Sequence, residues 1–362
     1  MTPLELELKK YDYKFPEKLI AQAPASPRDS AQLLVYNRKT KKIGFDTFLN
    51  LPKYLPKNCV LVFNDTKVIP ARFSAYKTSG GRVTLLYTKK DSKYIYALAA
   101  KNLQVGDVLA LDSGFHRNGI KNSERQKTKQ RKNLKVIGKI EREYILLPNF
   151  HTNEIESILQ KLGKTPLPPY IKNTPLSESK LRQEYQTIFA KHIGSVAAPT
   201  ASLHFTTRLL QKLKQSGIQT EYITLHVGLG TFASLTSEQL KTQTLHTEFY
   251  EITKQTADRL NKAKKIGRPI IAVGTTAVRT LESACDKQDK LTKLKNGTTL
   301  FIKKPYDFKF VDGIITNFHV PKSSLLMLVS AFAGREQIQG LYKTAVQKNY
   351  RLFSFGDGML IL

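Results

Sequence analysis

Short apolar runs, each followed by polar or glycine residues and then by a helical pattern, recur along the second half of the chain. Residues 196–200 precede a helical pattern over 206–216, residues 270–273 precede one over 277–286, and residues 313–316 precede one over 325–333. Apolar runs of this length predict buried strands, and helices between successive strands are typical of an α/β domain. We therefore expect a barrel-like or mostly parallel α/β main domain, with the loops after its strands gathered at one end.

The pattern changes between residues 73 and 148 to short alternating segments separated by turns. Regular short strands without a helical period predict a small antiparallel β-barrel. We therefore expect an α/β domain made of residues 1–72 and 149–362, with a β-barrel domain of residues 73–148 inserted into it. The expected strands are residues 82–87, 94–99, 107–111, 136–140 and 144–147.

A strongly basic run, Lys121 to Lys135, lies within the predicted barrel domain. Runs of this kind form solvated loops, but they also contact phosphate groups, and both interpretations remain open. The formal charge of the whole chain, +29, favours a polyanionic partner such as nucleic acid or an anionic membrane surface. A lysine-biased composition without any such partner is the alternative.

Polar side chains and glycines follow the predicted strands, where parallel strands would bring them together. The same residue types also cap helices and close turns, so capping is a second interpretation at several positions. Histidines in such loops favour acid/base chemistry or substrate contact. The converging set is Asn64, Thr200, His204, His226, Gly228, Gly230, Thr275, Asn317, His319 and Asp357.

Metal binding and membrane insertion are not expected. Cys59 and Cys285 stand far apart, and His246-Thr247-Glu248 lacks the Pro-Cys-x-x-Cys that a zinc deaminase would need. No apolar run reaches the roughly 18 residues of a membrane span, and the first ten residues do not resemble a signal peptide. These features predict a cytoplasmic protein.

General motifs for nucleotide binding and hydrolysis are missing. Gly228-Leu229-Gly230 lacks the third glycine of a dinucleotide fingerprint, and there is neither a Walker lysine motif nor a Gly-x-Ser-x-Gly elbow. Two other functions stay open on the residues alone. One is a non-catalytic RNA-binding protein, and the other is a barrel hydrolase acting on a nucleoside or sugar, which would need a pair of carboxylates.

Longer segments carry a resemblance that covers nearly the whole chain. The chain is similar to the S-adenosylmethionine:tRNA ribosyltransferase-isomerase family of queuosine biosynthesis. It departs from that family at Ser202, where glycine is typical, at Pro305, at Ala31-Gln32 and in the basic run. The matching segments are YDYKFPEKLIAQAP, LVFNDTKVIPARF, PLPPYI, EYQTIFAKHIGSVAAPTASLHFT, LHVGLGTF, HTEFYEI, GTTAVRTLES, TNFHVPKSSLLMLVSAFAG and YRLFSFGDGMLIL.

The resemblance implies an activity. The ribosyl part of S-adenosylmethionine would be transferred and isomerised onto 7-aminomethyl-7-deazaguanine at the tRNA wobble position. The products would be epoxyqueuosine-tRNA, adenine and methionine. S-adenosylmethionine would then be a consumed substrate, so no cofactor is expected. The expected partner is the anticodon stem-loop of tRNA, and the expected state is a cytoplasmic monomer without membrane contact.

The resemblance also allows roles to be assigned to residues. A sulfonium acidifies the adjacent 5′ carbon, so a base is needed there and an acid must help adenine to leave. His204 and His226 are the first candidates, followed by His319. The remaining substrate-binding candidates are Glu248 or Asp357 near the sulfonium; Thr200, Thr275, Thr276 and Asn317 for the ribose and adenine; Lys67, Arg72, Arg279 and Lys322 for tRNA phosphates or the methionine carboxylate; and Asn64, Asp65, Gly228, Gly230 and Thr231 along the pocket.

Overall fold

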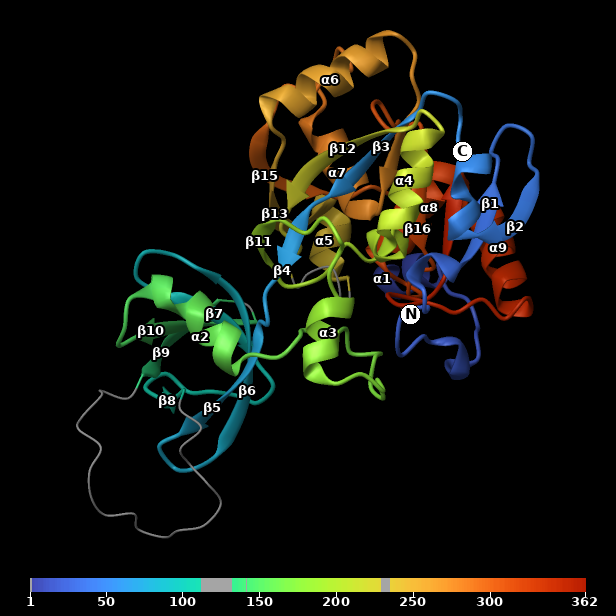
Figure 1. Cartoon of the computed structure of the whole chain (residues 1–362). Helices are drawn as coiled ribbons and strands as arrows, with labels where there is room; N and C mark the ends of the chain where they lie inside the picture. Colours follow the sequence, from blue (N-terminus) through green and yellow to red (C-terminus); the bar gives the residue numbers. More distant parts are fainter. Residues whose placement is uncertain (1, 112–131, 141, 229–234) are drawn as a thin grey trace. The chain divides into compact units, whose positions relative to one another are not determined.

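A computed structural model describes residues 2–111, 132–140, 142–228 and 235–362 (Figure 1). The chain divides into two compact units: the first combines Met1–Val68 with Leu167–Leu362, and the second is Ile69–Pro166. The second unit therefore extends beyond the expected 73–148 at both ends. The cause is local pairing, because the backbones of Arg72 and Lys164 exchange hydrogen bonds of 3.2 and 2.6 Å.

The first unit contains an open sheet that has nine strands among the described residues. Its centre is parallel, because β12, β3, β14 and β16 run in the same direction, whereas β13, β15, β2 and the β16–β17 pair are antiparallel. The predicted α/β class is confirmed, with a mixed and open sheet. In spatial order the strands are β15 (Lys295–Leu300), β13 (Thr244–Glu251), β12 (Gln219–Leu225), β3 (Val60–Asn64), β14 (Ile270–Val273), β16 (Gly313–Asn317), β17 (Gly358–Ile361), β1 (Gln32–Tyr36) and β2 (Ile43–Thr47).

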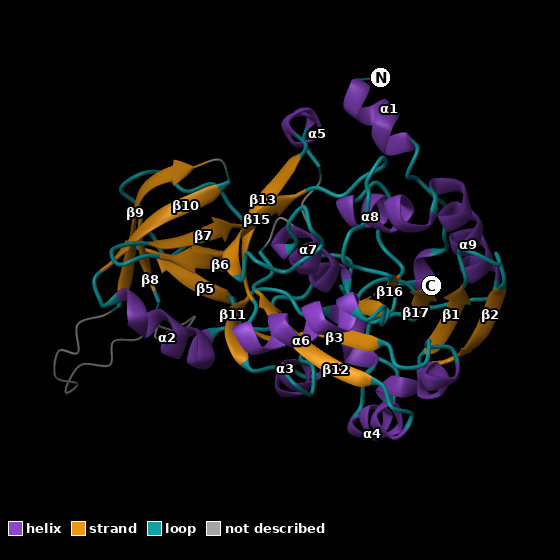
Figure 2. Ribbon diagram, turned by 90° about the horizontal axis from the view of Figure 1, so that it is seen from above, coloured by secondary structure: helices purple, strands orange, loops and turns teal. Residues whose placement is uncertain are grey.

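Helices cover both faces of this sheet (Figure 2). Side chains alternate along β3, so that Val60 and Val62 pack with α6 (Lys254–Lys265), α7 (Thr275–Ala284), α8 (Ser324–Ala333) and α9 (Arg335–Gln347). Leu61 and Phe63 face the other side and pack with α4 (Thr207–Gln215) and the 3₁₀ helix Phe48–Lys53. The remaining described elements of this unit are α1 (Pro3–Lys9), α3 (Glu178–Glu184), α5 (Ser237–Thr242), the 3₁₀ helices Glu17–Leu19, Arg28–Ser30 and Thr200–His204, and the parallel pair β4 (Thr66–Val68) and β11 (His192–Ser195).

The second unit is a closed antiparallel barrel, which confirms the prediction of an inserted β-barrel. Alternation places Val83, Leu85 and Tyr87 of β6 in its interior. Strand β5 was not predicted, and α2 (Ile155–Leu162) buries Ile155 and Leu159. The barrel order is β10 (Glu143–Pro148), β7 (Ile95–Ala99), β6 (Arg82–Lys90), β5 (Arg72–Lys77), β8 (Val108–Ala110) and β9 (Asn133–Ile140).

The end of the basic run forms part of a strand. Residues 121–131 lie outside the described residues, whereas β9 begins at Asn133. Leu134 lies in this strand and is fully buried in the barrel, so the end of the run contributes an apolar side chain to the barrel interior. The expectation of a loop over the whole run is therefore wrong for residues 133–135.

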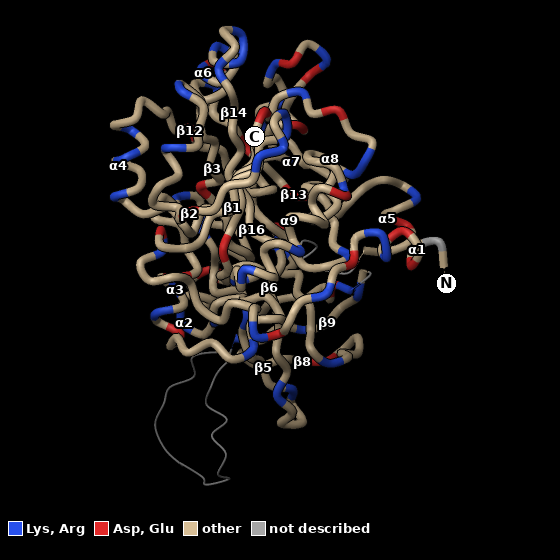
Figure 3. The backbone as a smooth tube through the Cα atoms, turned by 90° about the vertical axis from the view of Figure 1, so that its right-hand side faces the viewer, with Lys and Arg blue, Asp and Glu red and all other residues tan. Residues whose placement is uncertain are grey.

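Positive charge is spread over helices that face solvent. Figure 3 shows lysine and arginine along α4 and α6. In the part of the chain that the structure describes, no helix is long and apolar enough to cross a membrane. The same part contains no group of three or more His, Cys, Asp or Glu side chains placed to hold a metal ion.

Candidate functional site

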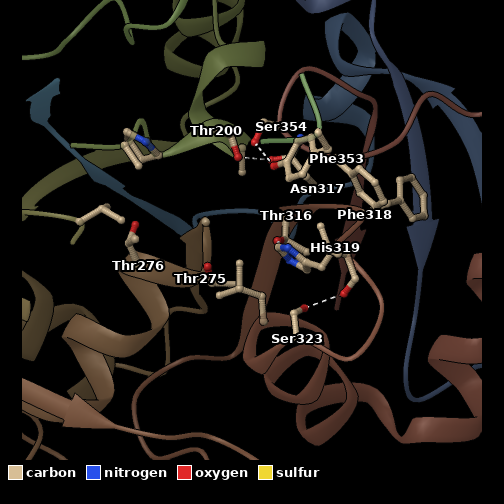
Figure 4. Close-up of a pocket in the computed structure, with 18 of the residues that line it drawn as sticks. Thr200, Thr275, Thr276, Thr316, Asn317, Phe318, His319, Ser323, Phe353 and Ser354 are labelled. Carbon is tan, nitrogen blue, oxygen red and sulfur yellow. Dashed lines mark hydrogen bonds between the residues drawn. The ribbon is translucent and has the colours of Figure 1, made fainter. Parts of the chain in front are cut away.

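A cavity of about 410 Å³ opens in the first unit, beside the carboxyl ends of β14 and β16. Hydroxyl and amide groups share its walls with aromatic rings (Figure 4). Among the described residues, none that lines it is Asp or Glu. The polar and aromatic lining consists of Tyr170, Thr200, Thr275, Thr276, Thr316, Asn317, Phe318, His319, Lys322, Ser323, Phe353 and Ser354.

Two threonines reach this cavity because α7 begins immediately after β14. Gly274 alone joins the two elements, at a φ of +88° that favours glycine, and the helix then starts at Thr275. The Asn64 amide donates a hydrogen bond of 3.2 Å to the Thr276 hydroxyl and another of 2.9 Å to the Leu225 carbonyl. The Asn64 carbonyl oxygen accepts from the backbone of Leu225 and Thr66. Asn64 thus ties β3, β12 and α7 together and orients Thr276 without itself lining the cavity.

A second hydrogen-bonded chain orients Asn317. The Thr200 hydroxyl donates to Asn317 Oδ1 at 2.8 Å, and Asn317 Nδ2 donates to His204 Nε2 at 3.3 Å. The His204 ring stacks on Phe48 at 4.0 Å between ring centroids. Burial, reinforced by Arg351 and Arg28, lowers the pKa of His204 to about 3. His204 is therefore neutral at physiological pH and lies behind Asn317, not on the cavity wall.

His319 is the histidine that lines the cavity. Its Nε2 is 2.8 Å from the Thr316 hydroxyl. Its backbone is held from both sides, because its N–H donates to the Tyr342 hydroxyl at 2.8 Å and its carbonyl accepts from the Tyr13 hydroxyl at 2.7 Å. Burial lowers the pKa of His319 to about 3, so the ring is a neutral imidazole with one nitrogen able to accept a proton.

His226 belongs to a different cluster. Its Nδ1 lies 2.8 Å from the Thr66 hydroxyl, and its ring occupies space that a side chain on Gly194 would enter at 2.9 Å. Burial lowers its pKa, with a further contribution from His192. Val227 lines the cavity, but His226 does not, so the expected meeting of His226 with His319 around one cavity is not what the structure shows.

Asp65 lies in the cluster of His226. Its Oδ1 accepts a hydrogen bond of 2.6 Å from Thr224, and its Oδ2 is 3.7 Å from His192 Nε2. Burial is the main cause that raises the pKa of Asp65. Lys67 is an exposed residue of β4 and does not line the cavity.

Glu248 and Arg279 form a buried ion pair. Glu248 also accepts a hydrogen bond of 2.9 Å from the Gly228 backbone, and Arg279 Nε donates to the Leu300 carbonyl at 3.1 Å. Neither side chain lines the main cavity; both lie beside a smaller one of about 20 Å³. The pair joins β13, α7 and the loop after β12.

Several other predicted residues have structural partners or lie elsewhere. Lys322 lines the cavity but is paired with Asp12 at 2.8 Å. Asp357 is fully buried and accepts hydrogen bonds from the backbone of Gln32 and Arg351, so it holds the turn before β17. Arg72 belongs to the second unit. Gly230 and Thr231 lie outside the described residues.

The sequence did not reveal the aromatic wall. The Tyr170 hydroxyl is 2.6 Å from Ser354 Oγ, and the ring of Tyr170 lies 5.0 Å from that of Phe353. Tyr170 follows a proline-rich stretch, Pro166-Leu167-Pro168-Pro169, which carries no signal of a binding site. An aromatic residue after a stiff proline-rich stretch could have indicated a binding surface. Its partners Ser354 and Phe353 lie far along the chain, so the sequence does not show that they meet.

The fold and the cavity define a class of protein. A pocket at the carboxyl ends of parallel strands is the usual binding place in open α/β sheets, and 410 Å³ falls in the range of small-molecule sites. Neutral hydrogen-bonding groups beside aromatic rings suit a nucleoside-like ligand. The protein therefore belongs to the class of α/β proteins with a small-molecule site at the carboxyl ends of parallel strands.

Comparisons with known proteins identify the family. Residues 8–361 match the model of the family described as queuosine biosynthesis protein. S-adenosylmethionine:tRNA ribosyltransferase-isomerases from Carboxydothermus hydrogenoformans and Aquifex aeolicus are 44% and 42% identical to this chain, each over 99% of it and 100% of the relative. A crystal structure of S-adenosylmethionine tRNA ribosyltransferase from Thermotoga maritima, 32% identical, aligns with a TM-score of 0.53 over 98% of this chain and all of that one. The chain belongs to the queuosine biosynthesis protein family.

Proposed function

We propose that this protein is an S-adenosylmethionine:tRNA ribosyltransferase-isomerase. It transfers and isomerises the ribosyl part of S-adenosylmethionine onto 7-aminomethyl-7-deazaguanine at the tRNA wobble position. Epoxyqueuosine-tRNA, adenine and methionine are the products. The observation that carries this proposal is the full-length similarity to relatives of that name, at 40–44% identity in the seven compared. S-adenosylmethionine is consumed, so the reaction needs no cofactor.

The cavity suits the donor molecule. The Thr200 hydroxyl and the Asn317 amide match the ribose hydroxyls and the adenine edge, and the rings of Tyr170 and Phe353 offer a surface for adenine. The absence of acidic side chains from the described lining argues against the nucleoside or sugar hydrolase, which would need two carboxylates.

His319 is the first candidate for the residue that transfers a proton. It lines the cavity, it is neutral, and hydrogen bonds on both sides of its backbone fix its position. His204 acts as a positioning residue, because it reaches the cavity only through Asn317. His226 stays a candidate base that would act from the cluster of Asp65, outside the described lining.

The tRNA partner accounts for the basic charge. Lysine and arginine outnumber aspartate and glutamate by 58 to 29, and neutralising phosphates with such side chains gives binding that weakens as salt increases. We assign the anticodon stem-loop as the part of tRNA that is bound and the monomer as the working state. The cytoplasm, where tRNA is found, is the expected location.

One assay tests the function. Purified protein is incubated with S-adenosylmethionine and tRNA that carries 7-aminomethyl-7-deazaguanine; free adenine is measured by chromatography and the modified nucleoside by mass. We expect adenine and a heavier nucleoside only when both substrates are present. Adenine released without tRNA would indicate a hydrolase, and tRNA binding without adenine release would indicate a non-catalytic RNA-binding protein.

A variant series then assigns the proton-transfer residue. His319→Gln should lower adenine release by about 10² or more, because a general acid or base contributes on that order. His246→Gln is the matched control, since His246 is exposed on β13. Binding of tRNA should be the same in both variants. Wild-type adenine release in His319→Gln would remove His319 from the mechanism.

A further inference from the structure

The first turn of α7 presents unused hydrogen-bond donors to the cavity. The N-cap residue is Gly274, so no side chain caps this helix, and its first backbone hydrogen bond runs from Val278 N–H to Gly274 O at 3.3 Å. The N–H groups of Thr275, Thr276 and Ala277 therefore have no partner within the helix, whereas that of Gly274 donates to the Ile315 carbonyl at 2.8 Å. Thr275 and Thr276 line the cavity, so two of these donors lie at its wall.

The Thr275 side chain is an independent sign of a missing partner. Its exposed fraction is 8%, and it lines the cavity. Its hydroxyl has no hydrogen-bond partner among the described residues, whereas the hydroxyl of the neighbouring Thr276 accepts from Asn64. Figure 4 shows Thr275 and Thr276 on one side of the cavity, with Asn317 and His319 on the other. A hydroxyl that faces a cavity without a protein partner is available to donate a hydrogen bond to a bound acceptor.

Such a site prefers an anion. The N-terminus of a helix carries partial positive charge, and unpaired N–H groups with a nearby hydroxyl fit the oxygens of a carboxylate. Of the cations expected to hold the methionine carboxylate, Arg279 is paired with Glu248, Lys67 is not part of the lining, and Lys322 lines the cavity in a half-exposed ion pair with Asp12.

We propose that the first turn of α7, with the Thr275 hydroxyl, binds the carboxylate of the amino-acid part of S-adenosylmethionine. This inference rests on the proposed function, because that donor carries a single anionic group, its carboxylate. The methionine end of the donor then lies against α7. The adenosine end extends away from α7, towards the other groups of the lining.

Calorimetry with two ligands tests the inference. The ligands are S-adenosylmethionine and decarboxylated S-adenosylmethionine, which lacks the carboxylate but keeps the adenosine, the sulfonium and the amine. The wild-type protein should bind the first about 10- to 100-fold more tightly, the range expected for hydrogen bonds to a charged group. Equal affinities would overturn the inference and leave the proposed function standing. Failure of both ligands to bind, with tRNA present at saturation, would overturn the inference, whereas the proposed function stands or falls with the adenine-release assay.

Variants locate the effect at α7. Thr275→Val should weaken binding of S-adenosylmethionine by about 10-fold and leave the affinity for the decarboxylated ligand unchanged. Thr275→Ser keeps the hydroxyl and should restore the wild-type ratio. Thr207→Val is the matched control, because Thr207 is the exposed first residue of α4. If Thr275→Val weakened both ligands by the same factor, the hydroxyl would not contact the carboxylate and the inference would be wrong.

Discussion

Acidification should destabilise the first unit through its two buried histidines. His204 and His319 have pKa values lowered to about 3, in both cases chiefly by burial. In the unfolded chain each ring takes up a proton near pH 6.5. Between these values the unfolded state binds more protons than the folded state, so the free energy of unfolding falls as the pH falls.

The magnitude follows from the pKa difference. At pH 5, about 1.5 units below the unfolded pKa, each histidine should cost about 2 kcal/mol of stability, and the pair about 4 kcal/mol. The loss should begin near pH 6.5 and continue towards pH 3. Carboxylates titrate over the lower part of this range in every variant, so differences between variants isolate the histidines.

The assay is urea unfolding from pH 7.5 to pH 5. Far-ultraviolet circular dichroism follows it, because the chain contains no tryptophan. His204→Gln and His319→Gln should each flatten the dependence of the free energy of unfolding on pH, by up to about 1.4 kcal/mol per pH unit. His246→Gln, at an exposed position, should leave it unchanged. If neither buried variant differed in slope from the wild type, the two rings would titrate normally and burial would not hold them neutral.

Two further substitutions test contacts around the site. Arg279→Met should lower the free energy of unfolding by about 3–5 kcal/mol, because it leaves the buried Glu248 without its arginine. The double variant Arg279→Met/Glu248→Met should regain much of this loss, as measured by chemical denaturation. Additive losses from the two substitutions would contradict the pairing. Gly194→Ala should cost about 1–3 kcal/mol, since its Cβ would come within 2.9 Å of the His226 ring and its φ of +152° disfavours alanine. The part of this cost that is due to the ring should be lost in a His226→Ala background, and the same cost in both backgrounds would rule out that contact.

The repeating strand–loop–helix pattern predicted much of the fold. Segments with a strong pattern, such as β14 with α7, were found in the sequence because an uninterrupted apolar run and a helical period are both local signals. Helix α6 was not predicted. It is rich in lysine, and its buried face is made of small or isolated residues, Ala257, Leu260 and Ala263. The apolar stripe is therefore too weak to be recognised by its period.

The candidate site was predicted in part. Thr275, Thr276, Asn317 and Thr200 line the cavity as expected, because parallel strands bring their carboxyl ends together. His226 does not, because successive residues of an extended segment point to opposite sides and the inward position belongs to Val227. Sequence alone cannot tell which of the two neighbours faces inward.

Some polar residues were predicted to bind ligand but form hydrogen bonds within the protein, because both roles need the same donor and acceptor groups. Asp357 accepts N–H groups from Gln32 and Arg351. Its sequence position at a strand end is equally consistent with a ligand contact. The partner that decides between the two, Gln32, is separated from it by most of the chain, so only the tertiary structure identifies the role.

The hydrogen bonds of Asn64 have a consequence for ligand entry. Because this amide already holds the Thr276 hydroxyl, as Asn317 holds that of Thr200, these groups are ordered before any ligand arrives. The loss of side-chain rotational freedom therefore accompanies folding and not association. Replacing Asn64 by a residue without an amide should therefore weaken ligand binding and make its entropy less favourable, although Asn64 does not line the cavity.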